Sequence, residues 1–220
     1  MQSNVSSTRR ITILIGLALT LILPLVPLLP GGRELLSVPG LDPLIGREPF
    51  WWTLATIVLL YVLVIERKPL TSIGLRKINW KTIVFGVVTA AVILGCVGSM
   101  IYFGFPLLHL KQNAGALQKM LSLPYWCRFI IVLRAAVVEE ILFRGYGIER
   151  LQELTGNRFV AGALTLAAFT MAHLSYWGWT QLLIAGAAGL FLTILYLWRR
   201  DLVSNMIAHF LVDGVSILLR

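Results

Sequence analysis

Long apolar segments constrain the fold of this chain more than any other feature. Hydrophobic residues make up 58% of the sequence and charged residues 13%, whereas a soluble domain carries about 45–50% and about 25%. A transmembrane helix needs about 20 mostly apolar residues. Seven segments approach this length, at about residues 11–29, 50–65, 82–104, 126–148, 158–174, 180–198 and 202–218. The pattern predicts an all-α, polytopic transmembrane helix bundle of about seven spans.

The first segment is preceded by Arg9 and Arg10, as in a signal peptide, but it contains Pro24 and Pro27, is followed by Pro30, and lacks a small-x-small cleavage site. We therefore expect it to be retained as the first span. The whole chain, residues 1–220, is then a single integral membrane domain, in which residues 1–68 form two generic N-terminal spans.

Basic residues give the chain a net charge of +9, and they predict its orientation. They concentrate in short loops between apolar spans, as cytoplasmic loops require. Nucleic-acid binding is not expected, because no soluble basic region interleaved with aromatics is present. With the N-terminus inside, twelve basic residues fall on the inner side: Arg9, Arg10, Arg67, Lys68, Arg76, Lys77, Lys81, Arg144, Arg150, Arg158, Arg199 and Arg200. Six fall outside: Arg33, Arg47, Lys111, Lys119, Arg128 and Arg220. Arg134 is set aside as intramembrane.

Two connections between spans combine polar and apolar residues. Residues 72–81 (SIGLRKINWK) are expected to lie along the inner membrane surface as an amphipathic segment. Residues 111–123 place apolar side chains at helical spacing and predict a second interfacial helix that ends before Pro124.

Ionisable residues inside spans are costly, so each one is a candidate for function. The fourth segment contains Glu139 and Glu140, the fifth ends at His173, and the seventh carries His209 and Asp213. Asn205 lies one helical turn before His209 on the same face. Three spans can therefore each project polar groups inward, and the spacing predicts one polar site.

Helix geometry assigns the two glutamates different partners. Glu140 and Arg144 are four residues apart, in the orientation that favours an ion pair. Glu139 points about 100° away and can face a cavity. The fourth helix is expected to end at Gly156, with Asn157 as the next N-cap. In an antiparallel hairpin centred there, Glu139 and His173 are equally far from the turn, so they can meet.

A glutamate beside a histidine is the minimum set for activating a water molecule, and a second histidine can stabilise an oxyanion. We therefore expect hydrolysis by water. Three alternatives stay open. The polar cluster could be structural, in a membrane immunity or binding protein. Glu139 could be the proton site of a small transporter. Glu139, His173 and His209 could also bind zinc, although no HExxH or Cys/His cluster occurs.

Three motifs resemble those of the CPBP family, which comprises CAAX prenyl proteases and bacteriocin-processing or Abi membrane proteins. They are EExxxR at Glu139, Glu140 and Arg144, FxxxH at Phe169 and His173, and HxxxD at His209 and Asp213. The stretch at residues 72–81 also resembles a segment of this family. The resemblance covers roughly residues 70–220, which would form the catalytic core.

The resemblance implies a CAAX-type membrane protease, a glutamic endopeptidase that needs no cofactor. It implies that Glu139 and His173 activate water and that His209 with Asp213 stabilises the oxyanion. Glu140 and Arg144 would support the site, and Phe169 would pack beside it. Much of the family has Asn at the last position, and an ionised Asp213 cannot donate a hydrogen bond to an oxyanion. Either Asp213 is protonated and donates to the oxyanion, or it orients His209.

The expected partners are membrane lipids and a peptide or lipidated protein, cleaved near its C-terminus after it enters from the cytoplasmic face. The compact chain favours a prokaryotic cytoplasmic membrane. The sequence does not specify the oligomeric state.

Overall fold

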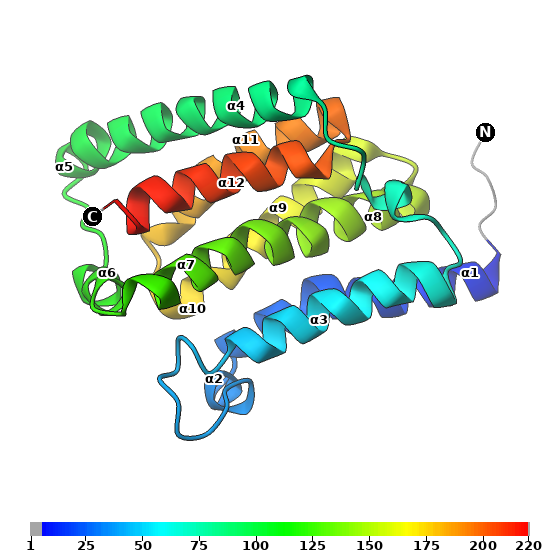
Figure 1. Cartoon of the computed structure of the whole chain (residues 1–220), viewed down its shortest axis with the longest axis horizontal. Coiled ribbons are helices and arrows are strands. Elements are labelled where there is room, and N and C mark those ends of the chain that lie inside the picture. Colours follow the sequence, from blue (N-terminus) through cyan, green and yellow to red (C-terminus); the bar gives the residue numbers. More distant parts are fainter. Residues whose placement is uncertain (1–5, 220) are drawn as a thin grey trace.

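The computed structural model describes residues 6–219, so Arg220, which was counted for the orientation, lies outside the described part. The N-terminal third forms a long helical hairpin (Figure 1). Its elements are α1 (Ser7–Leu17), η1 (Ala18–Ile22), η2 (Leu23–Leu28), α2 (Gly32–Leu35), α3 (Glu48–Leu60) and η3 (Tyr61–Ile65). The N-cap Ser6 accepts a hydrogen bond from the backbone N–H of Arg9, so the first span begins with a satisfied cap.

The remaining chain adds five more long helical segments. The third consists of α4 (Trp80–Ser99), η5 (Met100–Gly104) and α5 (Phe105–Leu107), after the short η4 (Leu70–Ile73). The fourth is continuous through α7 (Tyr125–Arg134), η6 (Ala135–Ile148) and α8 (Glu149–Thr155), and α6 (Ala114–Leu121) precedes it. The last three are α9 (Arg158–Ala172) with α10 (Leu174–Trp177), α11 (Gln181–Arg199) and α12 (Leu202–Ile217). Among the described residues all regular elements are helices, as predicted.

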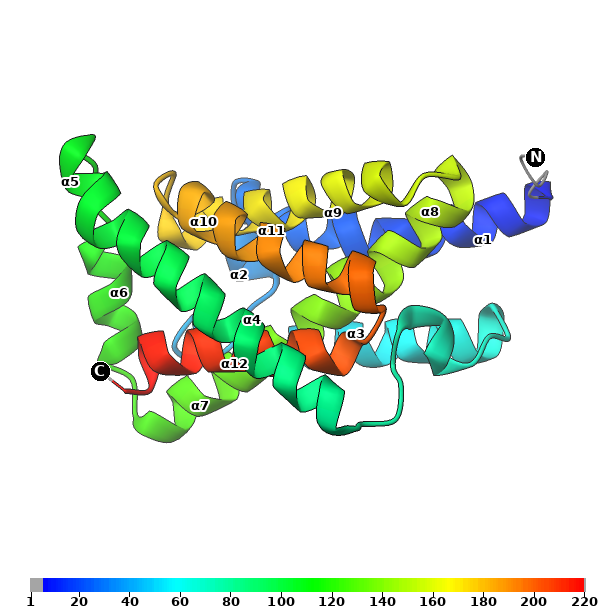
Figure 2. The ribbon, with the colours of Figure 1, turned by 90° about the horizontal axis from the view of Figure 1, so that it is seen from above.

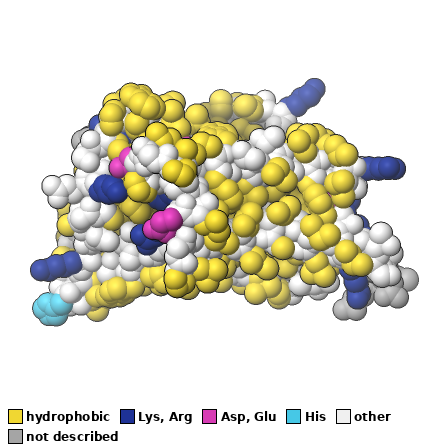
Figure 3. Space-filling model, turned by 90° about the horizontal axis from the view of Figure 1, so that it is seen from below, with side chains coloured by type: hydrophobic (Ala, Val, Ile, Leu, Met, Phe, Trp, Pro, Cys, Tyr) yellow, Lys and Arg dark blue, Asp and Glu magenta, His cyan; other side chains and the backbone are white. Residues whose placement is uncertain are grey.

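All seven predicted spans are helical, and five are long and apolar enough to cross a membrane: Ser7–Leu28, Glu48–Ile65, Trp80–Leu107, Arg158–Trp177 and Gln181–Arg199. The fourth helix is instead rich in charged residues, and Leu202–Ile217 is shorter. Both pack inside the bundle, where α12 contacts α4 and η6. The space-filling view shows a broad apolar surface along the middle of the molecule, with Lys and Arg side chains toward its two ends (Figure 3). The bundle is therefore suited to a bilayer, and the charged middle of its fourth helix is buried among the other helices.

Successive long helices run in opposite directions, so the turns between them lie alternately at the two ends of the bundle (Figures 1 and 2). We call the end that holds the start of α1, the α8–α9 turn and the α11–α12 turn the N-terminal end. The far end holds α2, α5, α6, α10 and the end of α12. Of the twelve basic residues assigned to the inner side, ten have exposed or partly exposed side chains near the N-terminal end. Arg144 and Arg150 are the exceptions, because their side chains are 1% and 3% exposed in internal ion pairs. Neither is a surface charge, and counting them for orientation was wrong.

The two connecting segments have different structures. Residues 72–81 form no helix of their own: the 3-10 turn Leu70–Ile73 ends at Gly74, which has a φ of 82°. The chain then runs without helix to Asn79, which caps α4 through its side chain. The second segment forms the predicted helix, α6, with Asn113 as its N-cap, and it ends before Pro124. The position of both segments at the membrane surface stays a prediction.

The hairpin between the fourth and fifth spans forms as predicted. Gly156 ends α8 with a φ of 69°, a left-handed conformation that suits glycine. Asn157 accepts hydrogen bonds from the backbone N–H groups of Phe159 and Val160 and so caps α9. This turn sets the register in which Glu139 and His173 face each other.

A buried ionic network holds the N-terminal hairpin against the fourth helix. Glu66 has a fully buried side chain and binds Arg150 and Arg9, and it accepts a hydrogen bond of 2.9 Å from Tyr146. Nearby, hydrogen bonds from Arg9, offset in part by burial, and then from Lys68 lower the pKa of Glu153 to about 2. The first two spans are thus fixed to the helix that carries the glutamate pair.

Candidate active site

The glutamate pair lies in η6, a stretch of π-helix whose backbone hydrogen bonds run from each N–H to the carbonyl five residues earlier. This winding places residues five apart close together on one face. Arg134 and Glu139 are separated by five residues, and they form an ion pair with 2.6 Å between Nη1 and Oε1. The α-helical geometry assumed from the sequence does not predict this contact.

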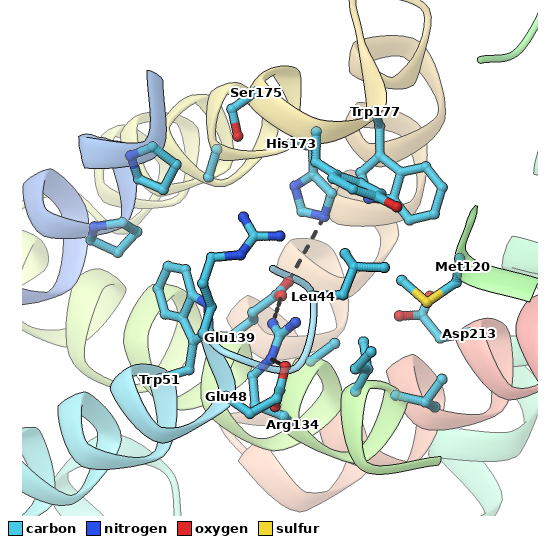
Figure 4. Close-up of a pocket in the computed structure, with 18 of the residues that line it drawn as sticks. Leu44, Glu48, Trp51, Met120, Arg134, Glu139, His173, Ser175, Trp177 and Asp213 are labelled. Atoms are coloured by element: carbon cyan, nitrogen blue, oxygen red, sulfur yellow. Dashed lines mark hydrogen bonds and ion pairs between the residues drawn. The ribbon is translucent and has the colours of Figure 1, made fainter. Parts of the chain in front are cut away.

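Glu139 is held by one of its two carboxylate oxygens. Its Oε1 accepts the hydrogen bond from Arg134, whose Nε also contacts Oε1 of Glu48 at 3.3 Å. The other oxygen, Oε2, is buried and has no hydrogen-bond partner among the described residues. Arg134 thus links α3 to Glu139 and orients the carboxylate (Figure 4).

His173 faces that free oxygen. Its Nε2 lies 3.9 Å from Oε2 of Glu139, so the pairing predicted across the hairpin is present in the structure (Figure 4). The ring is oriented by Nδ1, which lies 2.8 Å from the carbonyl oxygen of Phe169. Because a carbonyl can only accept, Nδ1 carries a hydrogen, and in the neutral ring Nε2 is an acceptor. Two acceptors therefore face each other across a gap too long for a direct hydrogen bond.

Glu140 is the centre of a second, fully buried cluster. It binds Arg144 at 3.0 Å, as the spacing predicted. It also accepts hydrogen bonds from Asn205 Nδ2 at 3.2 Å and from His209 Nδ1 at 2.9 Å. The cluster joins η6 to α12, and the cation of Arg144 lies 4.0 Å from the centre of the Phe169 ring. Phe169 in turn stacks on His173, with ring centres 4.6 Å apart.

His209 lies between two carboxylates. While Nδ1 contacts Glu140, Nε2 lies 3.5 Å from Oδ2 of Asp213. Glu140 is fully buried, whereas the Asp213 side chain is 30% exposed. Of the two roles that the sequence left for Asp213, the geometry matches the orientation of His209.

The two groups of residues line neighbouring pockets. Glu139, Glu48, Arg134 and Arg47 line the first pocket. His209 lines the second, which is otherwise walled mainly by apolar residues of α4, α11 and α12. His173, Trp177, Asp213 and Ile217 line both. Glu139 and His209 therefore line different pockets, whereas the sequence predicts one polar site that contains both. His173 and Asp213 lie at the boundary between the two pockets.

The geometry of the donors bears on the zinc alternative. Within residues 6–219, no group of three or more His, Cys, Asp and Glu side chains is arranged to hold a metal ion. Glu139 is paired with Arg134, and a guanidinium beside a carboxylate disfavours a second cation there. Nδ1 of His209 faces Glu140 instead of Glu139 or His173. These residues do not fit a zinc site made of Glu139, His173 and His209.

Arg134 and Glu48 are the site residues that sequence reasoning missed. The sequence analysis sets Arg134 aside as intramembrane and assigns it no partner, although an intramembrane charge requires one. Glu48 lies just before the second apolar segment and was not a candidate, but it is the first residue of α3 and only 6% exposed. A search for a carboxylate that could pair with Arg134 would have considered Glu139, five residues later. The sequence offers no signal that Glu48 of α3 lies next to Arg134.

The first pocket lies toward the far end of the bundle, where its wall includes Leu44 and Arg47 from the loop before α3, Met120 from α6, and Trp177 from α10. The N-terminus lies at the opposite end. If the N-terminus is inside, this pocket lies toward the outer side, whereas the sequence analysis expects the substrate to enter from the cytoplasmic face.

Comparison with protein families identifies a match over part of the chain. Residues 121–215 match the family described as type II CAAX prenyl endopeptidase Rce1-like. No curated protein and no solved structure matches the chain. The matched range holds the glutamate pair, Phe169, His173, Asn205, His209 and Asp213, whereas Glu48 and Arg47 lie outside it.

Proposed function

We propose that the chain hydrolyses a peptide bond with a water activated by Glu139 and His173. The premise is the match of residues 121–215 to the type II CAAX prenyl endopeptidase Rce1-like family, which supports the activity of an intramembrane protease in general. The observation that carries the finer proposal is the buried, unpartnered Oε2 of Glu139, 3.9 Å from the acceptor Nε2 of His173. One water oxygen can lie at about 2.8 Å from both and donate a hydrogen bond to each.

In the proposed reaction this water attacks the scissile carbonyl carbon while Glu139 accepts its proton. The carbonyl oxygen becomes an oxyanion, and the proton then passes from Glu139 to the leaving nitrogen as the C–N bond breaks. The products are a new carboxylate and a new amine. Arg134 acts as a positioning residue, because its bond to Oε1 keeps Oε2 directed at His173. No step requires a metal ion or an organic cofactor.

We propose that His209 supports the oxyanion through Nε2. Its other nitrogen is fixed by Glu140 at 2.9 Å, which sets the ring orientation. The contact between Nε2 and Asp213 is 3.5 Å long, so an oxyanion in the boundary region between the two pockets can compete for the same hydrogen. Asp213 then orients the imidazole and does not itself bind the oxyanion.

We propose a peptide or lipidated protein of the membrane, cut near its C-terminus, as the substrate class. To test this, protein C-termini are compared by mass spectrometry in cells that contain the wild-type protein or His173→Asn. The Asn amide can still donate to the Phe169 carbonyl, but nothing replaces Nε2. We expect a defined set of C-terminal fragments that disappears in the variant. If the variant reaches wild-type levels in the membrane and produces the same fragments, the proposed reaction is wrong, and a non-catalytic role is favoured.

We also propose that the N-terminal end faces the cytoplasm and that the first pocket opens to the opposite side. Ten exposed or partly exposed basic residues near the N-terminal end, against Arg33, Arg47, Lys111, Lys119 and Arg128 near the far end, support this orientation. The substrate then reaches the site from outside, in place of the cytoplasmic access expected from the sequence.

Two matched variants test the orientation. Lys77 and Lys111 are exposed residues in non-helical segments at opposite ends of the bundle. Each is replaced by Cys in a background in which Cys96 and Cys127 are replaced by Ala. We expect a membrane-impermeant maleimide to label Lys111→Cys in intact cells and Lys77→Cys only after lysis. The reverse pattern would place the pocket on the cytoplasmic side.

A further inference from the structure

Arg47 lies in the wall of the first pocket, together with Glu139 and His173. It immediately precedes α3 and belongs to the loop that connects the first two spans. This residue lies outside the range that matches the family and has no part in the proposed reaction. It therefore requires a separate explanation.

Hydrogen bonds within the loop, and contacts made by the Arg47 side chain itself, fix the position of this side chain. The backbone N–H groups of Ile45 and Gly46 bind the carbonyl of Asp42, while that of Leu44 binds the Asp42 side chain. Nε of Arg47 donates to the Pro43 carbonyl at 2.8 Å, and its guanidinium carbon lies 5.9 Å from the centre of the Tyr176 ring. These contacts occupy Nε and one face of the group.

The charge of Arg47 is not matched by a carboxylate. Among the described residues it takes part in no ion pair within 4.0 Å, whereas Arg134, the other arginine of this pocket, contacts both Glu48 and Glu139. Burial, and then the nearby charges of Arg134 and Arg33, lower the pKa of Arg47. A half-buried cation in this setting gains electrostatic energy when an anion binds beside it.

We propose that Arg47 is a substrate-binding residue that forms an ion pair with the C-terminal carboxylate of the peptide. This inference rests on the proposed function and deepens it. A peptide that lies in the first pocket with its scissile bond at Glu139 and His173 can place its end against Arg47. A planar guanidinium suits a carboxylate, which it can bind through two parallel hydrogen bonds. Recognition of the chain end would direct cleavage to C-terminal positions.

The probe for this inference is a pool of N-acylated decapeptides with randomised C-terminal residues, made once with free carboxylates and once with C-terminal amides. Purified protein in lipid nanodiscs is incubated with each pool, and cleavage is quantified by mass spectrometry. We expect the wild-type protein to cleave the free-acid pool about tenfold faster or more, which corresponds to one charge-assisted hydrogen-bonded contact.

Arg47→Gln is expected to remove this preference by slowing cleavage of the free acids while leaving the amides unchanged. Arg47→Lys keeps the positive charge but loses the planar guanidinium, so it should retain part of the preference for free acids. Arg10→Gln is the matched control, because Arg10 is an exposed arginine of α1, at the opposite end of the bundle, and lines neither pocket. Thermal unfolding of each variant in nanodiscs verifies that it is folded.

Three outcomes would overturn the inference. Equal cleavage of acids and amides by the wild-type protein would leave the proteolytic function intact but remove the carboxylate subsite. An equal loss of both in Arg47→Gln would show that Arg47 only shapes the pocket or binds a lipid phosphate. No cleavage of either pool by the wild-type protein, with the same result in Glu139→Gln, would contradict the proposed function and the subsite with it.

Discussion

Glu139→Gln is expected to abolish peptide-bond cleavage while the helix bundle stays folded. The carbonyl oxygen of Gln can still accept the hydrogen bond that Arg134 now donates to Oε1, so the side chain keeps its place. It has no carboxylate to take a proton from water, and the loss of a general base lowers rates by about 10²–10⁴-fold. Cleavage of the free-acid peptide pool in nanodiscs measures the effect.

The matched control for this prediction is Glu34→Gln. Glu34 is an exposed residue of α2 that does not line the first pocket, so the same chemical change there should leave the rate unaltered. The prediction fails if Glu139→Gln retains cleavage within a fewfold of wild type. A loss of activity that accompanies a loss of folded protein would instead assign Glu139 a structural role.

Glu140→Met is expected to destabilise the bundle more than any change at an exposed ion pair. The side chains of Glu140 and Arg144 are 0% and 1% exposed, and removal of the carboxylate leaves Arg144 and His209 without their buried anion. Breaking a buried pair from one side costs about 3–5 kcal/mol. Equilibrium unfolding in mixed micelles containing SDS measures the change in the free energy of unfolding.

Two further variants separate this effect from a general sensitivity of the bundle. The double variant Glu140→Met/Arg144→Met removes both charges and should recover part of the lost stability, since apolar replacement of both partners is often tolerated. Lys119→Met breaks the exposed contact with Asp42 and should change the free energy of unfolding by about 0–1 kcal/mol. A double variant that is no more stable than Glu140→Met would contradict the interpretation.

Sequence reasoning predicted most of the fold because hydrophobic length and capping residues are local signals. The seven segments, the turn at Gly156 and Asn157, and α6 depend on residues close together in the chain. The alternation of basic and apolar residues at 72–81 suits a membrane surface but does not specify a backbone conformation. Gly74 at positive φ and the capping side chain of Asn79 favour a turn and then a non-helical segment over a helix.

Two contacts of the candidate site were predictable from residue spacing along the chain, although Glu140 and Arg144 lie in the π-helical η6 and not in a regular α-helix. The pair of Glu140 with Arg144 follows from a spacing of four residues, and the pair of Glu139 with His173 from a symmetric hairpin. The contact between Arg134 and Glu139 requires π-helical winding, which no residue pattern in this sequence signals. The contact with Glu48 joins residues 86 positions apart, and such a pairing depends on how α3 packs against the fourth helix.

The contacts of Arg134 with Glu48 and Glu139 join two parts of the chain that contribute different features to the pocket. The groups proposed to activate water lie within the range that matches the family, whereas part of the wall that a substrate would touch comes from the N-terminal hairpin, through Pro24, Arg47 and Trp51. Exchange of this hairpin between related chains would alter the shape and charge of the pocket while the reacting groups stay the same. Selectivity can therefore evolve in one part of the gene while the chemistry is conserved in another.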